Sequence, residues 1–185
     1  YDCCPTSDGA SCVILAADHV ARQYTDTPVW INASAAASDY LALHDRPSIT
    51  QLLATQLAAK RAYEMAGINP KQVDLAEVHD CFTIAELFAT EDLGFAARGE
   101  GGLYAREGRG RRNEGNTCIN PSGGLKSKGH PLGATGTGQT VEIFKQLRAE
   151  VESSRQVRDA QQALSHNVGG SGATCAVHLY GRDRA

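Results

Sequence analysis

The sequence predicts an α/β fold in which helices cover a mixed β-sheet. Two observations carry this prediction. Short apolar runs alternate with segments of helical periodicity along the chain, which is typical of a layered α/β domain. The chain then closes on two strand-like runs that flank a glycine-rich turn, which indicates a hairpin. Alternating strands and helices favour parallel pairing and a hairpin is antiparallel, so the sheet should contain both.

Length and composition indicate one globular domain, with no nucleic-acid partner and no membrane span expected. Of the 185 residues, 42% are hydrophobic and 21% charged, which suits a domain with a real core. The formal net charge of −3 gives no indication of nucleic acid or an anionic membrane as partner. No apolar run approaches the roughly 18 residues that a membrane span needs. The N-terminus lacks a methionine and a signal-peptide pattern, so we expect part of a longer or processed polypeptide.

Cysteine usage indicates a reducing, cytoplasmic compartment. None of the 6 cysteines forms a Cys-x-x-Cys pair, so the spacing fits neither a zinc ribbon nor a thioredoxin-like motif. The chain is also too long and too poor in cysteine for a disulfide-stapled domain. We expect free thiols, most of them buried as small hydrophobic side chains.

Two strands and a short helix are expected near the N-terminus. Residues 11–17 form a continuous apolar run after a turn-like Thr-Ser-Asp-Gly, which suits a buried strand. A short helix over 18–23 should follow. Residues 28–37, small and β-branched, are the second strand candidate.

A long amphipathic helix is expected over residues 49–66. Ser48 and Gln51 have the spacing of a capping box, which predicts the start of this helix. Apolar residues then recur at helical spacing, and Gly67 follows the last of them as a stop signal.

The middle of the chain predicts a strand, a helix and a loop. Asn69 and the proline after it open a short helical turn. A strand is expected over 73–78 and a helix over 82–92 that ends at Gly94. Residues 98–116 are rich in Gly and Arg with little apolar content, which predicts a loop.

The C-terminal part predicts a helix followed by the hairpin. A glycine-dense segment over 120–138 leads into an amphipathic helix over 136–149, and a polar connection follows. Strands over 163–167 and 173–180 then flank the turn at 168–172.

His79 and Cys81 stand where a predicted strand ends and a helix begins, in the sequence Glu-Val-His-Asp-Cys-Phe over 77–82. The carboxyl ends of strands are where α/β sheets place ligands. A histidine and a helix N-terminus can lower the pKa of a nearby cysteine towards neutrality, as a thiol proton shuttle requires. A buried cysteine beside a histidine with satisfied hydrogen bonds is the alternative.

His130 lies in a glycine-rich loop, Gly-His-Pro-Leu-Gly-Ala-Thr-Gly over 129–136, that leads into a helix. Glycines let the backbone approach a ligand closely, and a helix N-terminus favours an anionic group. The order of the glycines fits neither the dinucleotide fingerprint nor the Walker phosphate loop. The alternative is a tight turn that holds a packed histidine.

A third polar segment runs over 165–172, from Ser-His-Asn into Val-Gly-Gly-Ser-Gly. The backbone N–H groups of such a turn can point at one site and stabilise an oxyanion. An ordinary hairpin turn is the alternative.

Together, the three segments resemble the C-terminal half of the thiolase family. The Gly-His-Pro at 129–131 is similar to that family's histidine loop. His-Asp-Cys-Phe at 79–82 stands where most thiolases carry Asn-Glu-Ala-Phe, and Asn-Val-Gly-Gly at 167–170 stands where most carry Cys-x-Gly-Gly. The two departures together resemble the sterol-carrier-protein thiolase branch, which includes many archaeal and bacterial acetoacetyl-CoA thiolases. Segments 2–10 and 120–126 also resemble this branch, so the likeness covers roughly residues 1–181.

The resemblance implies a catalytic role for four residues. His130 would activate a nucleophilic thiol and help to bind the thioester oxygen. His79 would complete that oxyanion hole, and Cys81 would be the acid/base that moves the α-proton of the second acyl group. The N–H of Gly169 would contribute to a second oxyanion hole.

Two further residues receive substrate-positioning roles. Asn167 fills the place of the family's lost cysteine and cannot shuttle a proton, and Gly170 belongs to the same turn. The resemblance implies no permanently bound cofactor and no metal. Coenzyme A thioesters would enter as substrates.

The same resemblance divides the chain and identifies a missing group. Residues 1–27 would be the end of an N-terminal thiolase half, with its last strand and short helix, and 28–185 the C-terminal domain of a layered α-β-α fold. The family's nucleophilic cysteine lies in the N-terminal half, and we do not expect Cys3, Cys4 or Cys12 to replace it. The chain alone should therefore not turn over, and an N-terminal half is required.

The activity that the resemblance implies is Claisen condensation or thiolysis of 3-ketoacyl-CoA in lipid metabolism. The expected partners are acyl-CoA, the N-terminal half or subunit, further copies in a homo- or hetero-oligomer, and a zinc-ribbon/OB-fold protein. Two other functions stay open: a thiolase-like retro-aldolase subunit and a non-catalytic scaffold that binds acyl-CoA.

Two alternative uses of polar residues also stay open. His79, Cys81, His130 and His166 have ligand types that suit zinc. The arginines of the loop could touch the phosphates of coenzyme A, be solvated, or face a partner protein: Arg98, Arg106, Arg109, Arg111 and Arg112.

Overall fold

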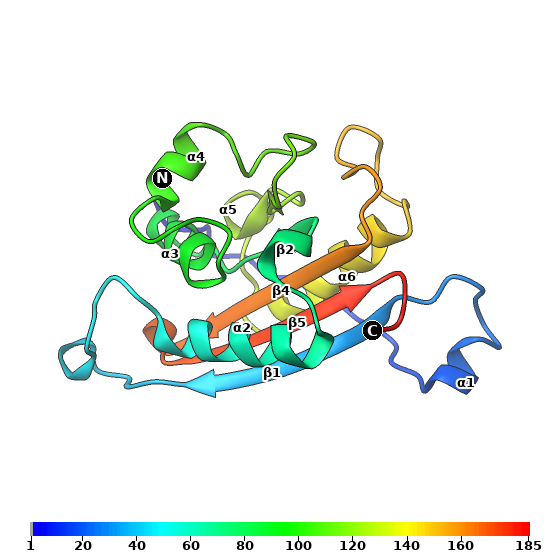
Figure 1. The fold of residues 1–185 in the computed structure, drawn as a ribbon, viewed down its shortest axis with the longest axis horizontal. Coiled ribbons are helices and arrows are strands. Elements are labelled where there is room, and N and C mark those ends of the chain that lie inside the picture. The colour runs from blue at the N-terminus through cyan, green and yellow to red at the C-terminus, as the bar shows by residue number, and fades with distance from the viewer. Residues whose placement is uncertain (1) are drawn as a thin grey trace.

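A computed structural model describes residues 2–185 and has a five-stranded mixed sheet at its centre (Figure 1). The strand order is β1-β5-β4-β2-β3. β4 pairs antiparallel with β5, and β5 with β1, whereas β2 pairs parallel with both β3 and β4. The strands are β1 Trp30–Ser38, β2 Leu75–Glu77, β3 Cys118–Ile119, β4 Gln162–Gly169 and β5 Thr174–Gly181. This architecture confirms the predicted mixed α/β sheet and the closing hairpin.

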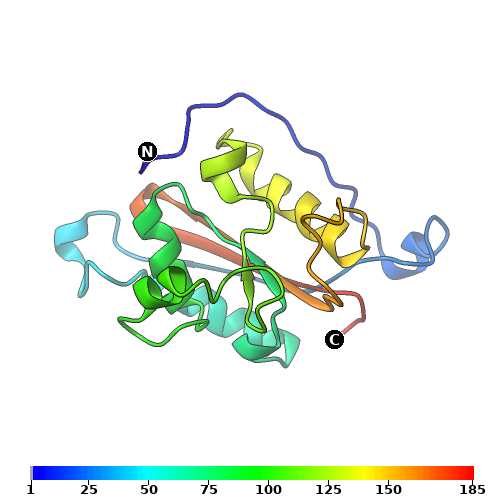
Figure 2. The same ribbon diagram turned by 90° about the horizontal axis from the view of Figure 1, so that it is seen from above.

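One long helix covers each face of the sheet (Figures 1 and 2). α2, Leu53–Ala66, packs its row of alanines on the face to which Leu164 of β4 points. α6, Thr135–Leu147, packs on the opposite face, where the neighbouring Ala163 points. Successive strand residues face opposite sides, so one strand serves both cores. The two cores confirm the layered α-β-α arrangement.

Shorter helices surround these layers. α3 and α4 pack on each other beside α2, and α5 lies between β3 and α6 in the chain (Figure 1). The short helices are α1 Asp18–Ala21, α3 Thr83–Asp92, α4 Gly101–Arg106 and α5 Gly124–Lys128, with 3₁₀ turns at Leu43–Asp45, Pro70–Gln72 and Gly170–Gly172. Among residues 2–185, no helix has both the length and the apolar character that a bilayer crossing requires.

The predicted strand over 11–17 is wrong. No described strand pairs with this run, and the chain there is extended without regular structure. Ile14 is 93% exposed and Leu15 71% exposed, so the apolar pattern does not mark a core strand in this chain. The division at 27/28 stays a prediction.

The start of the predicted helix over 49–66 is also wrong, although its end is confirmed. The helix begins at Leu53, and the Ser48 hydroxyl accepts a hydrogen bond from the Thr50 N–H instead of forming a capping box. The free N–H of Leu52 donates to Asp92 of α3 at 2.8 Å. A contact distant in sequence therefore replaces the local cap, while Gly67 ends the helix with a φ of 66° as predicted.

The loop predicted over 98–116 contains a helix, α4. The Gly101 N–H donates to the Glu91 carboxylate at 2.8 Å, and the buried Tyr104 hydroxyl donates to the Thr117 carbonyl at 3.0 Å. These tertiary bonds stabilise a helical turn that composition alone does not predict. The remaining predicted helices and strands are confirmed, with ends that differ by a few residues.

Candidate active site

The candidate site lies where β2, β3 and β4 end, at the same edge of the sheet. β2 and β4 run parallel with Glu77 opposite Ser165, so the residues that follow each strand emerge side by side. Asn120, directly after β3, accepts a hydrogen bond from the Val78 N–H at 2.8 Å and fixes the backbone before His79. The topology thus brings together three segments that are far apart in sequence.

His79 and His130 are in contact. Their ring centroids are 4.8 Å apart and the planes meet at 87°, an edge-to-face arrangement. His79 is only 5% exposed, and burial, followed by the effect of His130, lowers its pKa to about 4. Burial also lowers the pKa of His130, against the opposing effect of Asp80. Both rings are therefore neutral at pH 7.

The two rings differ in how their Nδ1 atoms are paired. Nδ1 of His130 lies 2.6 Å from the Thr135 hydroxyl. Nδ1 of His79 is buried and has no hydrogen-bond partner among the described residues. A buried polar atom without a partner is uncommon in folded proteins.

Asp80 anchors the loop that carries His130. Its buried carboxylate accepts hydrogen bonds from the Leu125 N–H at 2.7 Å and the Lys126 N–H at 3.4 Å, at the start of α5. Gly124 has a φ of 67°, and a Cβ there would overlap this carboxylate. The sequence reasoning missed Asp80, although the glycine pair at 123–124 marked the turn that surrounds it.

A buried polar network holds the ends of β2 and β4 together. His166 Nδ1 lies 3.4 Å from the His79 N–H, and its Nε2 lies 3.0 Å from the Thr55 hydroxyl. Burial lowers the pKa of His166 to about 3. Gln139 of α6 donates to the Glu77 and His166 carbonyls at 3.2 and 3.1 Å. The side-chain oxygen Oε1 of Gln139 accepts a hydrogen bond from the Asn167 side-chain amide at 3.2 Å. The sequence reasoning missed Gln139.

Cys81 lies beside the N-terminal segment. Cys3 and Phe82 form an antiparallel bridge, and the Cys4 N–H donates to the Cys81 carbonyl at 2.9 Å. Burial, and then the proximity of Cys4, raises the pKa of the Cys81 thiol. This direction is opposite to the lowering that the sequence predicted, because desolvation outweighs the hydrogen bond from the helix start. Cys81 is therefore a thiol, not a thiolate, at pH 7.

The N-terminal segment continues along the histidine loop (Figure 2). Ser7 fills the space beside Gly129, where a Cβ would overlap it, and Gly9 packs against Pro131. The Ser11 hydroxyl donates to the Ala134 carbonyl at 2.7 Å. Residues 2–11 thus cover one side of the loop that carries His130.

The remaining predicted site residues lie along the β4–β5 hairpin. Asn167 faces the start of α6, and a Cβ at Gly136 would lie 3.5 Å from its amide. Gly169 ends β4 opposite Thr174, and Gly170, with a φ of 53°, begins the turn. The structure brings His79 and His130 into direct contact, whereas Gly169 and Gly170 lie further along the hairpin.

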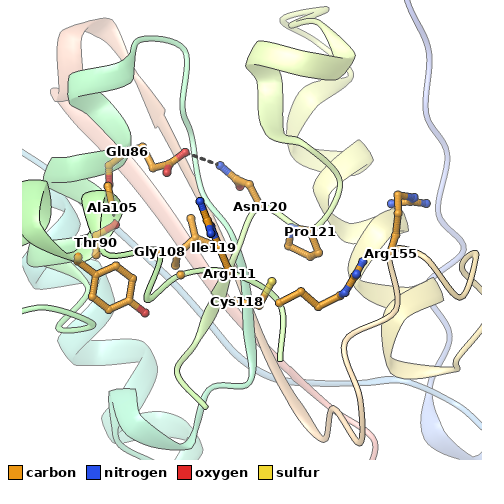
Figure 3. Close-up of a pocket in the computed structure, with 13 residues that line it drawn as sticks. Glu86, Thr90, Ala105, Gly108, Arg111, Cys118, Ile119, Asn120, Pro121 and Arg155 are labelled. Atoms are coloured by element: carbon orange, nitrogen blue, oxygen red, sulfur yellow. Dashed lines mark hydrogen bonds between the residues drawn. The ribbon is translucent and has the colours of Figure 1, made fainter. Parts of the chain in front are cut away.

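A cavity of about 340 Å³ lies next to the site, between α3, α4 and β3 (Figure 3). Asn120 connects the two, because it binds the Val78 N–H and donates to Glu86 in the cavity wall at 3.3 Å. Burial raises the pKa of Glu86. Arg111 and Arg112 line the same cavity. Two other arginines of the loop form ion pairs: Arg98 with Glu91 and Asp92, and Arg109 with Glu107.

The zinc site considered from the sequence is not formed. In the part of the chain that the structure describes, no three His, Cys, Asp or Glu side chains are placed to share a metal ion. His166 binds Thr55 instead, and His79 and His130 contact each other ring to ring.

Comparison with known proteins places this geometry in a family. The model of the thiolase C-terminal domain-like family matches residues 35–182. An acetyl-CoA acetyltransferase from Methanothermobacter thermautotrophicus is 52% identical over 98% of this chain and 47% of its own length. Sterol carrier protein 2 from Oryctolagus cuniculus is 43% identical over 96% of this chain and 33% of its own length. The chain thus spans half or less of these curated relatives.

A solved structure supports the same relationship. The structure named Ltp2-ChsH2(DUF35) aldolase matches with a TM-score of 0.80 and 26% identity, over 91% of this chain and 43% of that one. Fold and sequence agree. The chain belongs to the thiolase superfamily, with a thiolase C-terminal domain-like fold, in the branch that includes archaeal acetyl-CoA acetyltransferases and sterol carrier protein 2.

Proposed function

We propose that this chain supplies the acid/base and oxyanion-binding half of a thiolase that condenses acyl-CoA or cleaves 3-ketoacyl-CoA. The observation that carries the proposal is the contact between two neutral histidines, His79 and His130, beside the point where strand β2 ends. A neutral histidine has one nitrogen that donates and one that accepts. Two such rings suit a site that must both take a thiol proton and bind a thioester oxygen.

Each residue receives one role in this proposal. His130 takes the proton of a nucleophilic thiol and contacts the thioester oxygen, and His79 completes the oxyanion hole. Cys81 is the acid/base for the α-carbon of the second acyl group, and the thiol form that it holds at pH 7 carries the proton that an acid must supply. The Gly169 N–H contributes to a second oxyanion hole, while Asn167 and Gly170 position the substrate.

Other parts of the proposal concern what joins the chain. Coenzyme A thioesters are the substrates, and no bound cofactor is required. The nucleophile comes from an N-terminal half, because the curated relatives are at least twice as long as their matched regions. A homo- or hetero-oligomer, a zinc-ribbon/OB-fold partner, a cytoplasmic location and a role in lipid metabolism complete the proposal. The name of the similar aldolase structure joins two components, Ltp2 and ChsH2(DUF35), which supports a hetero-oligomer.

A chimera tests the proposal. The N-terminal part of the Methanothermobacter relative that lies outside the match would be fused to residues 1–185, with the whole relative as positive control. We expect the fusion to cleave acetoacetyl-CoA with free coenzyme A, and the isolated chain to be inactive. Replacing His130 by alanine should lower turnover about 10²–10³-fold.

Two outcomes would contradict the proposal. A fusion that elutes and melts like the relative but neither acylates nor cleaves would exclude catalysis. Acyl-CoA binding without turnover would then favour the scaffold function. Stable, stoichiometric acylation of a cysteine in the isolated chain would refute the need for a second half.

Retro-aldol cleavage of a β-hydroxyacyl-CoA is a second candidate, because the similar solved structure is named an aldolase. The same fusion distinguishes the two functions. Release of an aldehyde or ketone from a β-hydroxyacyl-CoA, without thiolysis of acetoacetyl-CoA, would favour the aldolase. His79, Cys81 and His130 argue for the thiolase, since they are the residues to which the thiolase resemblance assigns acid/base and oxyanion-binding roles.

A further inference from the structure

We infer that Thr135 is a positioning residue that fixes the tautomer of His130, with the proton on Nδ1 and the lone pair on Nε2. Thr135 is the first residue of α6 and is 5% exposed. It follows the histidine by five residues within the segment 129–136, and the sequence assigned it no role. The inference deepens the proposed function, because it names the nitrogen that would accept the thiol proton.

The hydrogen bonds of the Thr135 hydroxyl carry the inference. The hydroxyl donates to the Pro131 carbonyl at 3.1 Å, and it lies 2.6 Å from Nδ1 of His130. A hydroxyl has one proton and two lone pairs. Once its proton is directed to Pro131, it can only accept from His130. Nδ1 must then carry a hydrogen, and in a neutral ring this leaves the lone pair on Nε2.

The neighbouring His79 has the complementary arrangement. Its Nδ1 is buried without a partner. In protein interiors, a buried N–H group without an acceptor is rarer than a buried acceptor without a donor. The proton of His79 therefore belongs on Nε2 and the lone pair on Nδ1. The two touching rings therefore offer different groups to the site. His79 offers an N–H donor for an oxyanion, and His130 offers a lone pair for a proton.

This arrangement also prepares His130 for the charged state. When Nε2 takes up a proton, the Nδ1–H bond to the Thr135 hydroxyl is already formed. No hydroxyl has to rotate and no hydrogen bond has to be exchanged during the transfer. Groups that are oriented in advance in this way avoid the cost of reorganisation during the reaction.

Nitrogen-15 NMR of the isolated chain tests the inference directly, because imidazole nitrogens with and without a proton have well-separated chemical shifts. At neutral pH we expect Nδ1 of His130 to be protonated and Nε2 to be unprotonated. In Thr135→Val, the ratio of the Nδ1–H to the Nε2–H form should fall about 3- to 10-fold, as expected for the loss of one hydrogen bond. Thr135→Ser should restore the native ratio.

Thr140→Val is the matched control. Thr140 lies on the same helix, and its hydroxyl likewise donates to a carbonyl four residues earlier, that of Gly136 at 3.2 Å. It also lies 2.9 Å from the Tyr180 hydroxyl, and neither of these hydrogen bonds involves a histidine. This variant loses a comparable bond but should leave the His130 signals unchanged.

Several results would overturn the inference. They are a wild-type spectrum with the proton on Nε2 of His130, a native ratio in Thr135→Val, and an equal change in Thr140→Val. If Thr135→Val does not fold, the wild-type and Thr135→Ser spectra still decide the matter. The measurement needs no turnover, so it can succeed when the chimera is inactive and fail when the chimera is active.

Discussion

At the scale of single residues, burial is the main influence on the site. It lowers the pKa of His79 and His166 and raises that of Cys81, because desolvation disfavours every charged form. The residue types of the site are readable from the sequence, since His79, Cys81 and His130 stand in recognisable segments. Their protonation is not readable, because burial depends on Thr55, Gln139 and α6, which are distant in sequence.

The buried histidines predict acid sensitivity. The folded pKa is about 4 for His79 and about 3 for His166, against 6.5 for an exposed histidine. Between these values the unfolded chain binds more protons, so stability is lost as pH falls below about 6.5. Each ring contributes up to about 1.4 kcal/mol per pH unit in this window. Urea unfolding at pH 7, 6, 5 and 4 measures the slope.

Two variants test whether His166 causes part of this dependence of stability on pH. His166→Gln should flatten the dependence of unfolding free energy on pH, because one buried ring is then absent. His19→Gln, at an exposed position, should leave the slope as it is. Equal slopes in the wild type and in His166→Gln would show that His166 is not held neutral in the fold.

Cys81 predicts a separable defect in the chimera. Cys81→Ala should lower condensation and thiolysis about 10²–10⁴-fold, the usual range for an acid/base group, yet leave acylation of the N-terminal cysteine by acetyl-CoA intact. Cys4→Ala removes the thiol of the neighbouring N-terminal segment and should preserve turnover. Rapid-quench measurement of the acyl-enzyme separates the two steps. Loss of acylation in Cys81→Ala would assign this residue to the first step instead.

At the scale of elements, helix ends and short helices depend on tertiary partners. Periodicity correctly predicts α2, α3 and α6, because each buries one apolar side. The start of α2 is set by Asp92 and that of α4 by Glu91, which no local pattern shows. The strand predicted over 11–17 failed for a related reason, since an apolar run becomes a strand only where a neighbouring strand can pair with it.

Asp80 predicts a local effect on α5. Asp80→Ala removes the acceptor for two backbone N–H groups and should cost about 1–3 kcal/mol of stability. Hydrogen exchange should accelerate over residues 124–130, the segment that leads to His130. Asp74→Ala is the matched control, because Asp74 also accepts two backbone N–H bonds, from Gln161 and Gln162. Similar exchange over 124–130 in both variants would exclude a specific anchoring role.

At the scale of the whole molecule, the sheet has a long helix on each face, while residues 12–17 lie outside both cores. The layered fold follows from alternating periodicities and was therefore predicted correctly from the sequence. The strand order does not follow, because pairing of β2 with β3 and β4 joins segments about 40 and 90 residues apart. The site depends on that order, which explains why its residues could be predicted but their contacts could not.

The exposed run predicts tolerance to substitution in the isolated chain. The double change Ile14→Ser and Leu15→Ser should alter the unfolding free energy by less than about 0.5 kcal/mol, as at other exposed sites. Leu164→Ala, at a fully buried position of β4 that faces α2, should cost about 2–5 kcal/mol of unfolding free energy. Thermal and urea melts compare the two. A loss of several kcal/mol of unfolding free energy in the double variant would instead support the buried strand predicted over residues 11–17.

The position of the β4–β5 hairpin also has a kinetic consequence. These strands follow β1, β2 and β3 in the sequence, yet they occupy the middle of the sheet. β1 cannot pair until β5 has left the ribosome, and before β4 appears β2 can pair only with the two-residue strand β3. Pairings of such long sequence separation must close large loops first, which slows folding. The complete sheet, and with it the contact between His79 and His166, is therefore assembled after translation of this region and not during it.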